Sequence, residues 1–249
     1  MGKHLKLVLK IVGLELLIIV FFTINGVYTS ITNPTNTLME YIGLLPVVLG
    51  LWFYLMKTKK WADFFSNNRL ILDKESIQLW SPLLIILAIL LIGNGGIRIS
   101  SVSELVMIAG TQILIVAFIE EMVFRGFMIN ILISKGFKLA VLTSSLLFAL
   151  THSLQLLGGQ SIEVVIVQIT YAFFIGMVLS LLIVNNQPII ITITFHGLNN
   201  FLIMTSRTDG SSIYNYLIIS ILVVHSLFLW SKAPHFNRLK TEKVRQPAV

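Results

Sequence analysis

The fold is decided by one long apolar stretch, residues 103–133, which reads SELVMIAGTQILIVAFIEEMVFRGFMINILI. The stretch is long enough to cross a bilayer, since a spanning helix needs about 20 mostly apolar residues. It nevertheless holds two adjacent glutamates, Glu120 and Glu121, and an arginine, Arg125. Ionisable side chains inside a membrane helix are costly, so they mark a partner or a task. The stretch therefore indicates a membrane protein with a polar site inside it.

The composition of the whole chain supports this interpretation. The 249 residues are 56% hydrophobic and 12% charged, and the mean hydropathy is +0.89. Soluble domains carry roughly 45–50% apolar and about 25% charged residues, so a soluble globule and a disordered chain are both excluded. The chain has no cysteine, which excludes disulfides, cysteine–zinc clusters and thiol nucleophiles. The net charge of +7 lies in loops and tails, which indicates membrane topology rather than binding of nucleic acid.

Eight apolar runs predict an all-α, polytopic helix bundle in the cell membrane. They cover residues 11–28, 39–56, 82–96, 103–133, 139–157, 163–184, 188–204 and 213–230. Residues 61–80 are polar and are expected to lie along the membrane surface. We therefore expect one membrane domain over residues 1–230, followed by a basic cytoplasmic tail, 231–249, without regular structure.

The distribution of Lys and Arg predicts that both termini are cytoplasmic. With eight crossings, the cytoplasmic side then carries the basic segments 3–10, 57–74, 135–138 and 232–245. Only Arg98 and Arg207 remain on the other side. The opposite orientation would reverse this asymmetry.

The first polar pattern consists of Glu120, Glu121 and Arg125. Glu121 and Arg125 are four residues apart with the acid first, a spacing that favours an ion pair on a helix. Glu120 points about 100° away from Glu121 and is free to face another group, so it can act as a general base toward water. The alternative is a structural ion pair that locks two helices together.

Two further polar patterns lie on later helices. Phe148 and His152 share one helix face, and so do His196 and Asn200. Counted along each helix at 1.5 Å per residue, these groups and Glu120 reach overlapping depths in the inner or middle membrane. Three helices that bring polar groups to one level predict a single site, although an interhelical hydrogen bond also explains each pattern alone.

The three patterns together resemble the motifs of the type II CAAX prenyl endopeptidase and bacteriocin-immunity family, also called CPBP or Abi intramembrane proteases. The family's Glu-Glu-x-x-x-Arg, Phe-x-x-x-His and His-x-x-x-Asn runs match in order, with no departure at the motif positions. The matching core covers about residues 103–201. The resemblance implies a glutamate-dependent intramembrane endopeptidase built as an eight-helix bundle.

The same resemblance implies a role for each motif residue. Glu120 and His152 would activate a water for attack on a peptide carbonyl, while His196 and Asn200 would stabilise the oxyanion. The residue types are compatible with these roles, because a side-chain donor pair is one way to build an oxyanion hole.

Glu121 and Arg125 would orient the site, again by resemblance. A metal is a separate question: one Glu and two His can hold zinc, but the chain has no His-Glu-x-x-His helix, and the motif histidines lie on different helices. No cofactor is therefore predicted, and zinc catalysis is the lesser alternative. Glu15 and His225 are assigned to no site, and His225 is expected to form a hydrogen bond between helices.

The predicted activity is hydrolysis of a peptide bond in a membrane-associated peptide or protein, at a site opened toward the cytoplasm. By resemblance, the substrate can be lipid-linked, as in CAAX processing, or the role can be bacteriocin self-immunity. Membrane lipid is an expected partner, and nucleic acid is not. The alternative is a non-catalytic membrane scaffold that sequesters a toxin or a regulator. A transporter ranks low because the polar groups lie in one half of the chain, without an inverted repeat.

Overall fold

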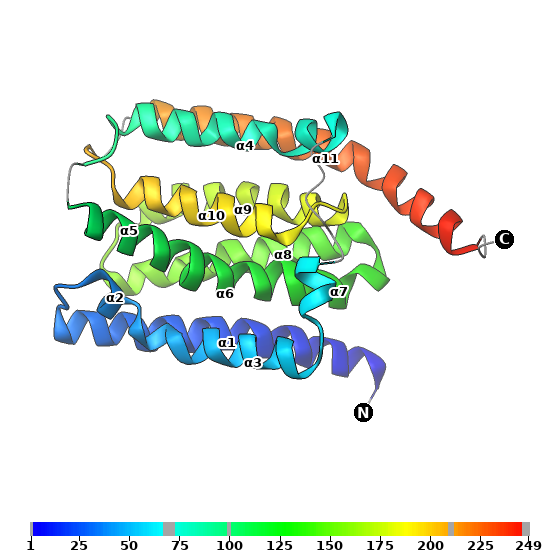
Figure 1. Cartoon of the computed structure of the whole chain (residues 1–249), viewed down its shortest axis with the longest axis horizontal. Coiled ribbons are helices and arrows are strands. Elements are labelled where there is room, and N and C mark those ends of the chain that lie inside the picture. The colour runs from blue at the N-terminus through cyan, green and yellow to red at the C-terminus, as the bar shows by residue number, and fades with distance from the viewer. Residues whose placement is uncertain (1, 67–72, 99–100, 209–211, 246–249) are drawn as a thin grey trace.

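The computed structural model describes residues 2–66, 73–98, 101–208 and 212–245. Every regular element in these ranges is helical, and the described strand pairing is one isolated bridge between Ile97 and Ser206. The predicted all-α bundle is therefore confirmed (Figure 1). Arg69, in the basic segment between the second and third predicted spans, lies outside the described residues.

Within the described ranges, six helices are long and apolar enough to cross a bilayer, and two shorter apolar helices accompany them. The long ones are α1 (Lys3–Thr32), α4 (Lys74–Gly93), α9 (Ile162–Val184) and the stretches Val102–Lys135, Phe137–Leu156 and Ile213–Ala233. The shorter ones are Ile42–Lys57 and Ile189–Met204. Each of the eight overlaps one predicted span. A helix suits such runs because it satisfies its own backbone groups in lipid.

Shorter elements complete these stretches. The segment that follows α1 contains α2 (Thr37–Glu40), η1 (Ile42–Leu44), α3 (Leu45–Lys57) and η2 (Ala62–Ser66). The central stretch consists of α5 (Val102–Thr111), η3 (Gln112–Ala117), α6 (Phe118–Glu121), η4 (Met122–Met128), α7 (Ile129–Leu132) and η5 (Ile133–Lys135). The chain ends with α8 (Phe137–Thr151), η6 (His152–Gly158), α9, α10 (Ile189–Met204) and α11 (Ser212–Arg245). The segments η3 and η4 are wide π turns on either side of α6.

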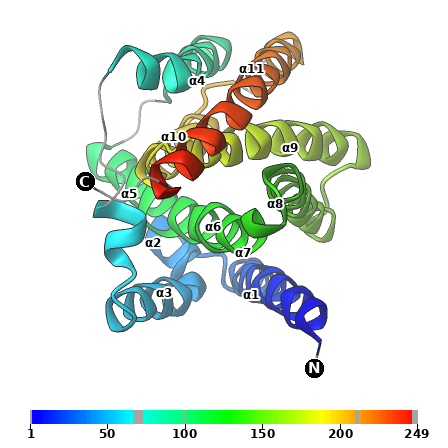
Figure 2. The ribbon, with the colours of Figure 1, turned by 90° about the vertical axis from the view of Figure 1, so that its right-hand side faces the viewer.

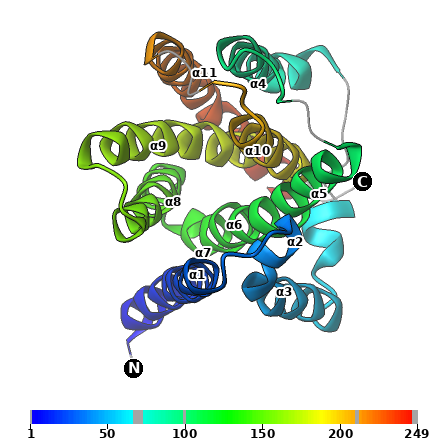
Figure 3. The same cartoon turned by 90° about the vertical axis from the view of Figure 1, so that its left-hand side faces the viewer.

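The helices are arranged in layers. α1 and α3 lie on one side of the bundle, α4 and α11 lie on the other, and α6 and α10 lie between them in both end views (Figures 2 and 3). α8 packs against α9, α9 against α11, and α10 against η3 and α4. The central position of α6 and α10 places the motif residues that they carry inside the bundle.

The two ends of the bundle differ in charge. The basic end is where the chain starts and where Lys57, Lys74 and Lys135 lie, at the ends of α3, α4 and η5. The opposite end is where α4 finishes at Gly93 and α10 at Met204.

Two predicted boundaries are wrong. α4 begins at Lys74 rather than at residue 82, because the Asp73 carboxylate accepts a hydrogen bond from the Ser76 N–H at 2.7 Å and caps the helix. Of the segment 61–80 that was predicted to lie along the membrane surface, residues 74–80 therefore belong to this apolar helix, and residues 67–72 lie outside the described residues. α11 continues to Arg245, through most of the tail that was expected to lack regular structure. The predicted span 139–157 agrees with the helical stretch Phe137–Leu156, within which α8 gives way at His152 to the 3-10 helix η6.

Polar side chains tie the outer helices to their neighbours. His225 Nε2 lies 2.8 Å from the Leu79 carbonyl oxygen and joins α11 to α4, which confirms the predicted hydrogen bond between helices. Asn185 Nδ2 donates to the Leu229 carbonyl at 3.2 Å and joins the end of α9 to α11. Glu15, in α1, has a buried carboxyl oxygen with no hydrogen-bond partner among the described residues.

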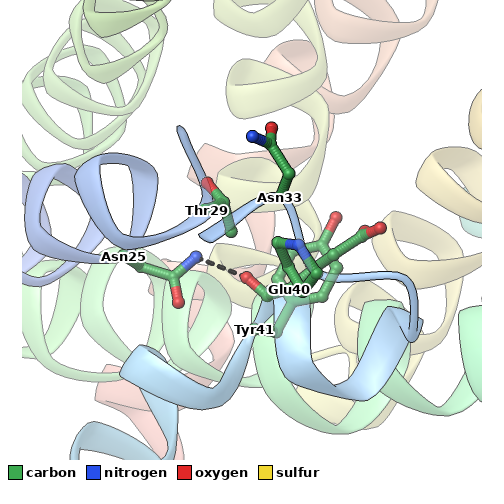
Figure 4. A pocket seen from close by; sticks show the side chains of 6 residues that line it. Asn25, Thr29, Asn33, Glu40 and Tyr41 are labelled. Atoms are coloured by element: carbon green, nitrogen blue, oxygen red, sulfur yellow. Dashed lines mark hydrogen bonds between the residues drawn. The ribbon is translucent and has the colours of Figure 1, made fainter. Parts of the chain in front are cut away.

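A hollow of about 380 Å³ lies beside the turn between α1 and α2 (Figure 4). Its wall includes Asn25, whose Nδ2 donates to the Glu40 carbonyl at 2.8 Å. The Asn25 Oδ1 also accepts from the Gly43 N–H at 3.0 Å. None of the motif residues lines this hollow, so Asn25 holds the turn together and lies apart from the candidate site.

Candidate active site

The Glu121–Arg125 pair forms the buried base of the site. Arg125 Nη1 donates to Glu121 Oε1 at 3.0 Å, and both side chains are fully buried. The predicted ion pair is therefore present. His196, on α10, places its Nδ1 2.8 Å from the same carboxylate oxygen. When Nδ1 donates its proton to Glu121, the orientation of the imidazole is fixed and Nε2 becomes the free ring nitrogen.

Glu120 contacts the other side of the same imidazole. Its Oε2 lies 3.3 Å from His196 Nε2. Because the two adjacent glutamates point in different directions, we expected them to have different partners. This expectation is wrong in one respect, since His196 contacts both of them. The explanation is that the ring comes from a facing helix and has nitrogens on two sides. The Glu120 side chain is 10% exposed and that of Glu121 is 0% exposed, so Glu120 is the one of the two carboxylates that keeps accessible surface.

Phe148 is the aromatic centre of the site. Its ring meets those of His152 and His196 edge to face, with centroids 5.1 and 5.6 Å apart. The guanidinium carbon of Arg125 lies 4.2 Å from the Phe148 centroid, within the range of a cation–π contact. One buried ring thus sets the positions of both motif histidines and of Arg125.

His152 lies at the junction of α8 and η6. Its Nδ1 is 3.0 Å from the Phe148 carbonyl oxygen. When Nδ1 donates to that carbonyl, Nε2 is an acceptor. His152 is therefore suited to accept a hydrogen bond from a water molecule.

Asn200 belongs to a chain of polar side chains. Its Nδ2 donates to Gln112 Oε1 at 3.3 Å, and its Oδ1 lies 3.5 Å from Asn199 Nδ2. The Tyr171 hydroxyl donates to Asn199 Oδ1 at 2.6 Å. The sequence analysis missed Gln112, Asn199 and Tyr171, although polar side chains in apolar helices were a signal for them. Because an amide nitrogen carries two hydrogens, Asn200 keeps one for a ligand.

A cavity of about 650 Å³ joins these groups. His152, His196 and Asn200 line it, whereas Glu120 is not among the lining residues and lies behind His196, which it contacts. The volume falls within the range of ligand pockets in proteins. Three of the four residues predicted to be catalytic therefore share one cavity, and the fourth lies against its wall.

The cavity lies toward the opposite end of the bundle. Its wall includes Asn94 just after α4, Ser206 just after α10, and Asn215 in the first turn of α11. We expected the site to open at the basic end, and for this cavity the expectation is wrong. The reason is the depth of His152, which lies near the far end of the stretch Phe137–Leu156 when this is followed from the basic end.

Two glycines allow the site helices to approach closely. A Cβ atom on Gly197 would lie 2.5 Å from Ile113 Cγ1 and 2.7 Å from Ile113 Cα. A Cβ on Gly176 would lie 3.1 Å from the Cα of Ser145 and 3.3 Å from Arg125 Nη2. Gly197 therefore allows α10 to pack closely against η3. Gly176 allows α9 to pack closely against α8, beside the guanidinium of Arg125.

The arrangement does not form a zinc site. Both ring nitrogens of His196 lie within hydrogen-bonding distance of carboxylates, so the ring has no nitrogen left for a metal. In the part of the chain that the structure describes, no three His, Asp or Glu side chains are grouped as metal ligands.

Comparison with known proteins identifies the family of this region. Residues 102–202, about two fifths of the chain, match the family model described as Type II CAAX prenyl endopeptidase Rce1-like. The matched region holds all three motifs, and the match confirms the family predicted from them. The chain matches no curated protein and no solved structure.

Proposed function

We propose that this Rce1-like chain is an intramembrane endopeptidase that hydrolyses a peptide bond with a water activated by Glu120. The observation that carries the proposal is the position of His196, which contacts Glu121 and Glu120 with its two ring nitrogens at the wall of the cavity. A structural ion pair would need only Glu121 and Arg125. A second carboxylate that keeps accessible surface beside the same imidazole supports catalysis.

The first step is attack by water. Glu120 Oε2 and His196 Nε2 share one proton. When His196 carries this proton, Glu120 is a carboxylate. Glu120 then takes a proton from the water while the water oxygen bonds to the scissile carbonyl carbon. His152 Nε2 accepts the second hydrogen bond of that water and holds it in place.

The second step is collapse of the tetrahedral intermediate. Once Glu120 is protonated, it no longer competes for the His196 Nε2–H, which can donate to the oxyanion together with the free N–H of Asn200. When the C–N bond breaks, the proton on Glu120 passes to the leaving amine nitrogen. Glu121 and Arg125 keep His196 oriented throughout.

Replacement of Glu120 tests the proposal. Glu120→Gln keeps the size of the side chain but removes the base, and general-base catalysis contributes roughly 100- to 10,000-fold. We expect at least a 100-fold loss of cleavage of a peptide pool by protein reconstituted in vesicles, measured by mass spectrometry. The matched control is Glu75→Gln, at an exposed position in the first turn of α4, which should cleave like the wild type.

Two results would contradict the proposal. Equal cleavage by Glu120→Gln and wild type, at equal protein levels, would remove Glu120 from the mechanism. An unchanged cellular phenotype of Glu120→Gln, with no cleavage by the wild type, would instead support a non-catalytic scaffold that binds a toxin or a regulator. Cleavage confined to prenylated peptides would support CAAX-type processing.

A further inference from the structure

We infer that the cavity accepts a polar, extended peptide segment that enters at the opposite end of the bundle, outside the cytoplasm. The inference rests on the proposed function, because it names the substrate class of the same cavity. It is carried by the chemistry of the cavity wall and by the place where the wall lies in the bundle.

Amide side chains dominate the polar part of the wall. Besides Asn199 and Asn200, they are Asn94, Gln155, Gln160, Gln168 and Asn215. Each amide offers both donors and an acceptor, as does each peptide group of an extended chain. The wall is therefore suited to a peptide backbone and places little demand on the side chains of the substrate.

The wall also has an apolar part, which includes Leu90, Val164, Val167, Ile175 and Ile203, so the amides disfavour a lipid chain only where it would lie against them. An isoprenoid tail would displace water from them and return no hydrogen bond, which opposes binding. Among the described residues of the lining, the charged side chain is that of Glu163, while Arg98 and Arg207 belong to the loops at the rim. An uncharged polar peptide therefore fits the wall best.

The rim of the cavity is held by backbone contacts between two loops. The Arg98 N–H donates to the Thr205 carbonyl at 2.7 Å, and the Arg207 N–H donates to the Asn94 carbonyl at 3.2 Å. These bonds fasten the end of α4 to the end of α10. The entrance is thus preformed at this end, with Asn94 in its wall.

The side of the membrane follows from the charges. Lys57, Lys74 and Lys135 mark the basic end, which the positive-inside rule places in the cytoplasm. The cavity wall reaches the other end, where Asn215 and Gln160 are exposed. The substrate therefore approaches from the extracytoplasmic side.

Cysteine labelling tests the direction, and the absence of native cysteine makes it direct. We expect a membrane-impermeant maleimide to label Asn215→Cys on intact cells. Ser134→Cys, exposed in η5 at the basic end, should react only after the cells are permeabilised. The reverse pattern would overturn the inferred direction.

Protection of a cavity cysteine tests the substrate class. The reporter is purified Gln168→Cys, and the probes are a pool of random decapeptides of Ala, Ser, Asn and Gly and the same pool with a C-terminal farnesylated cysteine. We expect the unmodified pool to slow maleimide labelling at least threefold, and farnesylation to add nothing. Thr58→Cys, at the exposed end of α3, controls for effects of peptide on the reagent.

The outcomes separate this inference from the proposed function. Protection by the farnesylated pool alone, or by neither pool, would overturn the substrate class. Labelling needs no catalysis, so the same test works with Glu120→Gln added. Protection without any cleavage by the wild type would refute the peptidase proposal and leave a peptide-binding cavity.

Discussion

The contact between α10 and η3 gives the sharpest structural prediction, through Gly197→Ala. An alanine Cβ at this position would lie 2.5 Å from Ile113 Cγ1 and 2.7 Å from Ile113 Cα. The second atom belongs to the backbone, so no side-chain rotation can relieve the overlap. α10 must therefore move away from η3, and His196, one residue earlier, moves with it.

The size of the effect follows from a matched control. Alanine is favoured over glycine in a helix interior by about 1 kcal/mol. Gly50→Ala, in the middle of α3 with no atom within 4 Å of the new Cβ, keeps this gain without overlap. The difference between the two variants therefore isolates the cost of overpacking, about 1–3 kcal/mol. We expect the upper end, about 3 kcal/mol, because the backbone of Ile113 is involved.

Thermal unfolding in detergent measures this difference. About 3 kcal/mol corresponds to a melting temperature roughly 6–12 °C lower for Gly197→Ala than for Gly50→Ala. Gly126→Ala should fall between them, since its nearest contacts, 3.3 Å to Met122 Cε and 3.4 Å to Phe64 Cε1, are side-chain ends. Equal melting temperatures for Gly197→Ala and Gly50→Ala would refute the close approach of α10 to η3.

Three further substitutions test other contacts. Glu121→Gln leaves the buried charge of Arg125 unpaired, which costs about 3–5 kcal/mol; a wild-type yield of folded protein in size-exclusion chromatography would contradict this. Gln112→Leu removes the acceptor that holds Asn200, so we expect about tenfold slower peptide cleavage with little change in substrate affinity, and undiminished turnover would show that Asn200 is held otherwise. Asn25→Leu removes two hydrogen bonds to the backbone, so the free energy of unfolding should fall by about 2 kcal/mol. Cleavage per folded molecule should stay at the wild-type level, and a reduced value would connect the turn between α1 and α2 to the site.

The helices and the motif residues were predictable because each leaves a local signal. Runs of apolar residues predicted eight spans, and all eight overlap apolar helices in the structure. The i,i+4 spacing of Glu121 and Arg125 predicted their ion pair, which depends only on the geometry of one helix. The start of α4 was missed although Asp73, a good N-cap residue, stood just before it.

The connections between helices were not predictable in the same way. His196 contacts both glutamates, and Gln112 holds Asn200. Both contacts depend on which faces of α10 and of the central stretch meet. The direction of the cavity depends on which helix ends surround it, here those that carry Asn94, Ser206 and Asn215, and spacing along one helix does not show this. Spacing along a helix constrains its own side chains, whereas the partner across the interface follows from packing.

The two adjacent glutamates have different tasks because one imidazole divides them. Glu121 binds both Arg125 Nη1 and His196 Nδ1 through one oxygen, so its charge is already compensated and is poorly available to react. That bond selects the tautomer that leaves Nε2 of His196 facing Glu120. Glu120 has no such cation of its own, and its basicity depends on a proton that it shares with the ring. Removal of Glu121 should therefore impair catalysis even where the fold survives, because the proton would no longer be directed to the side of the ring that faces Glu120.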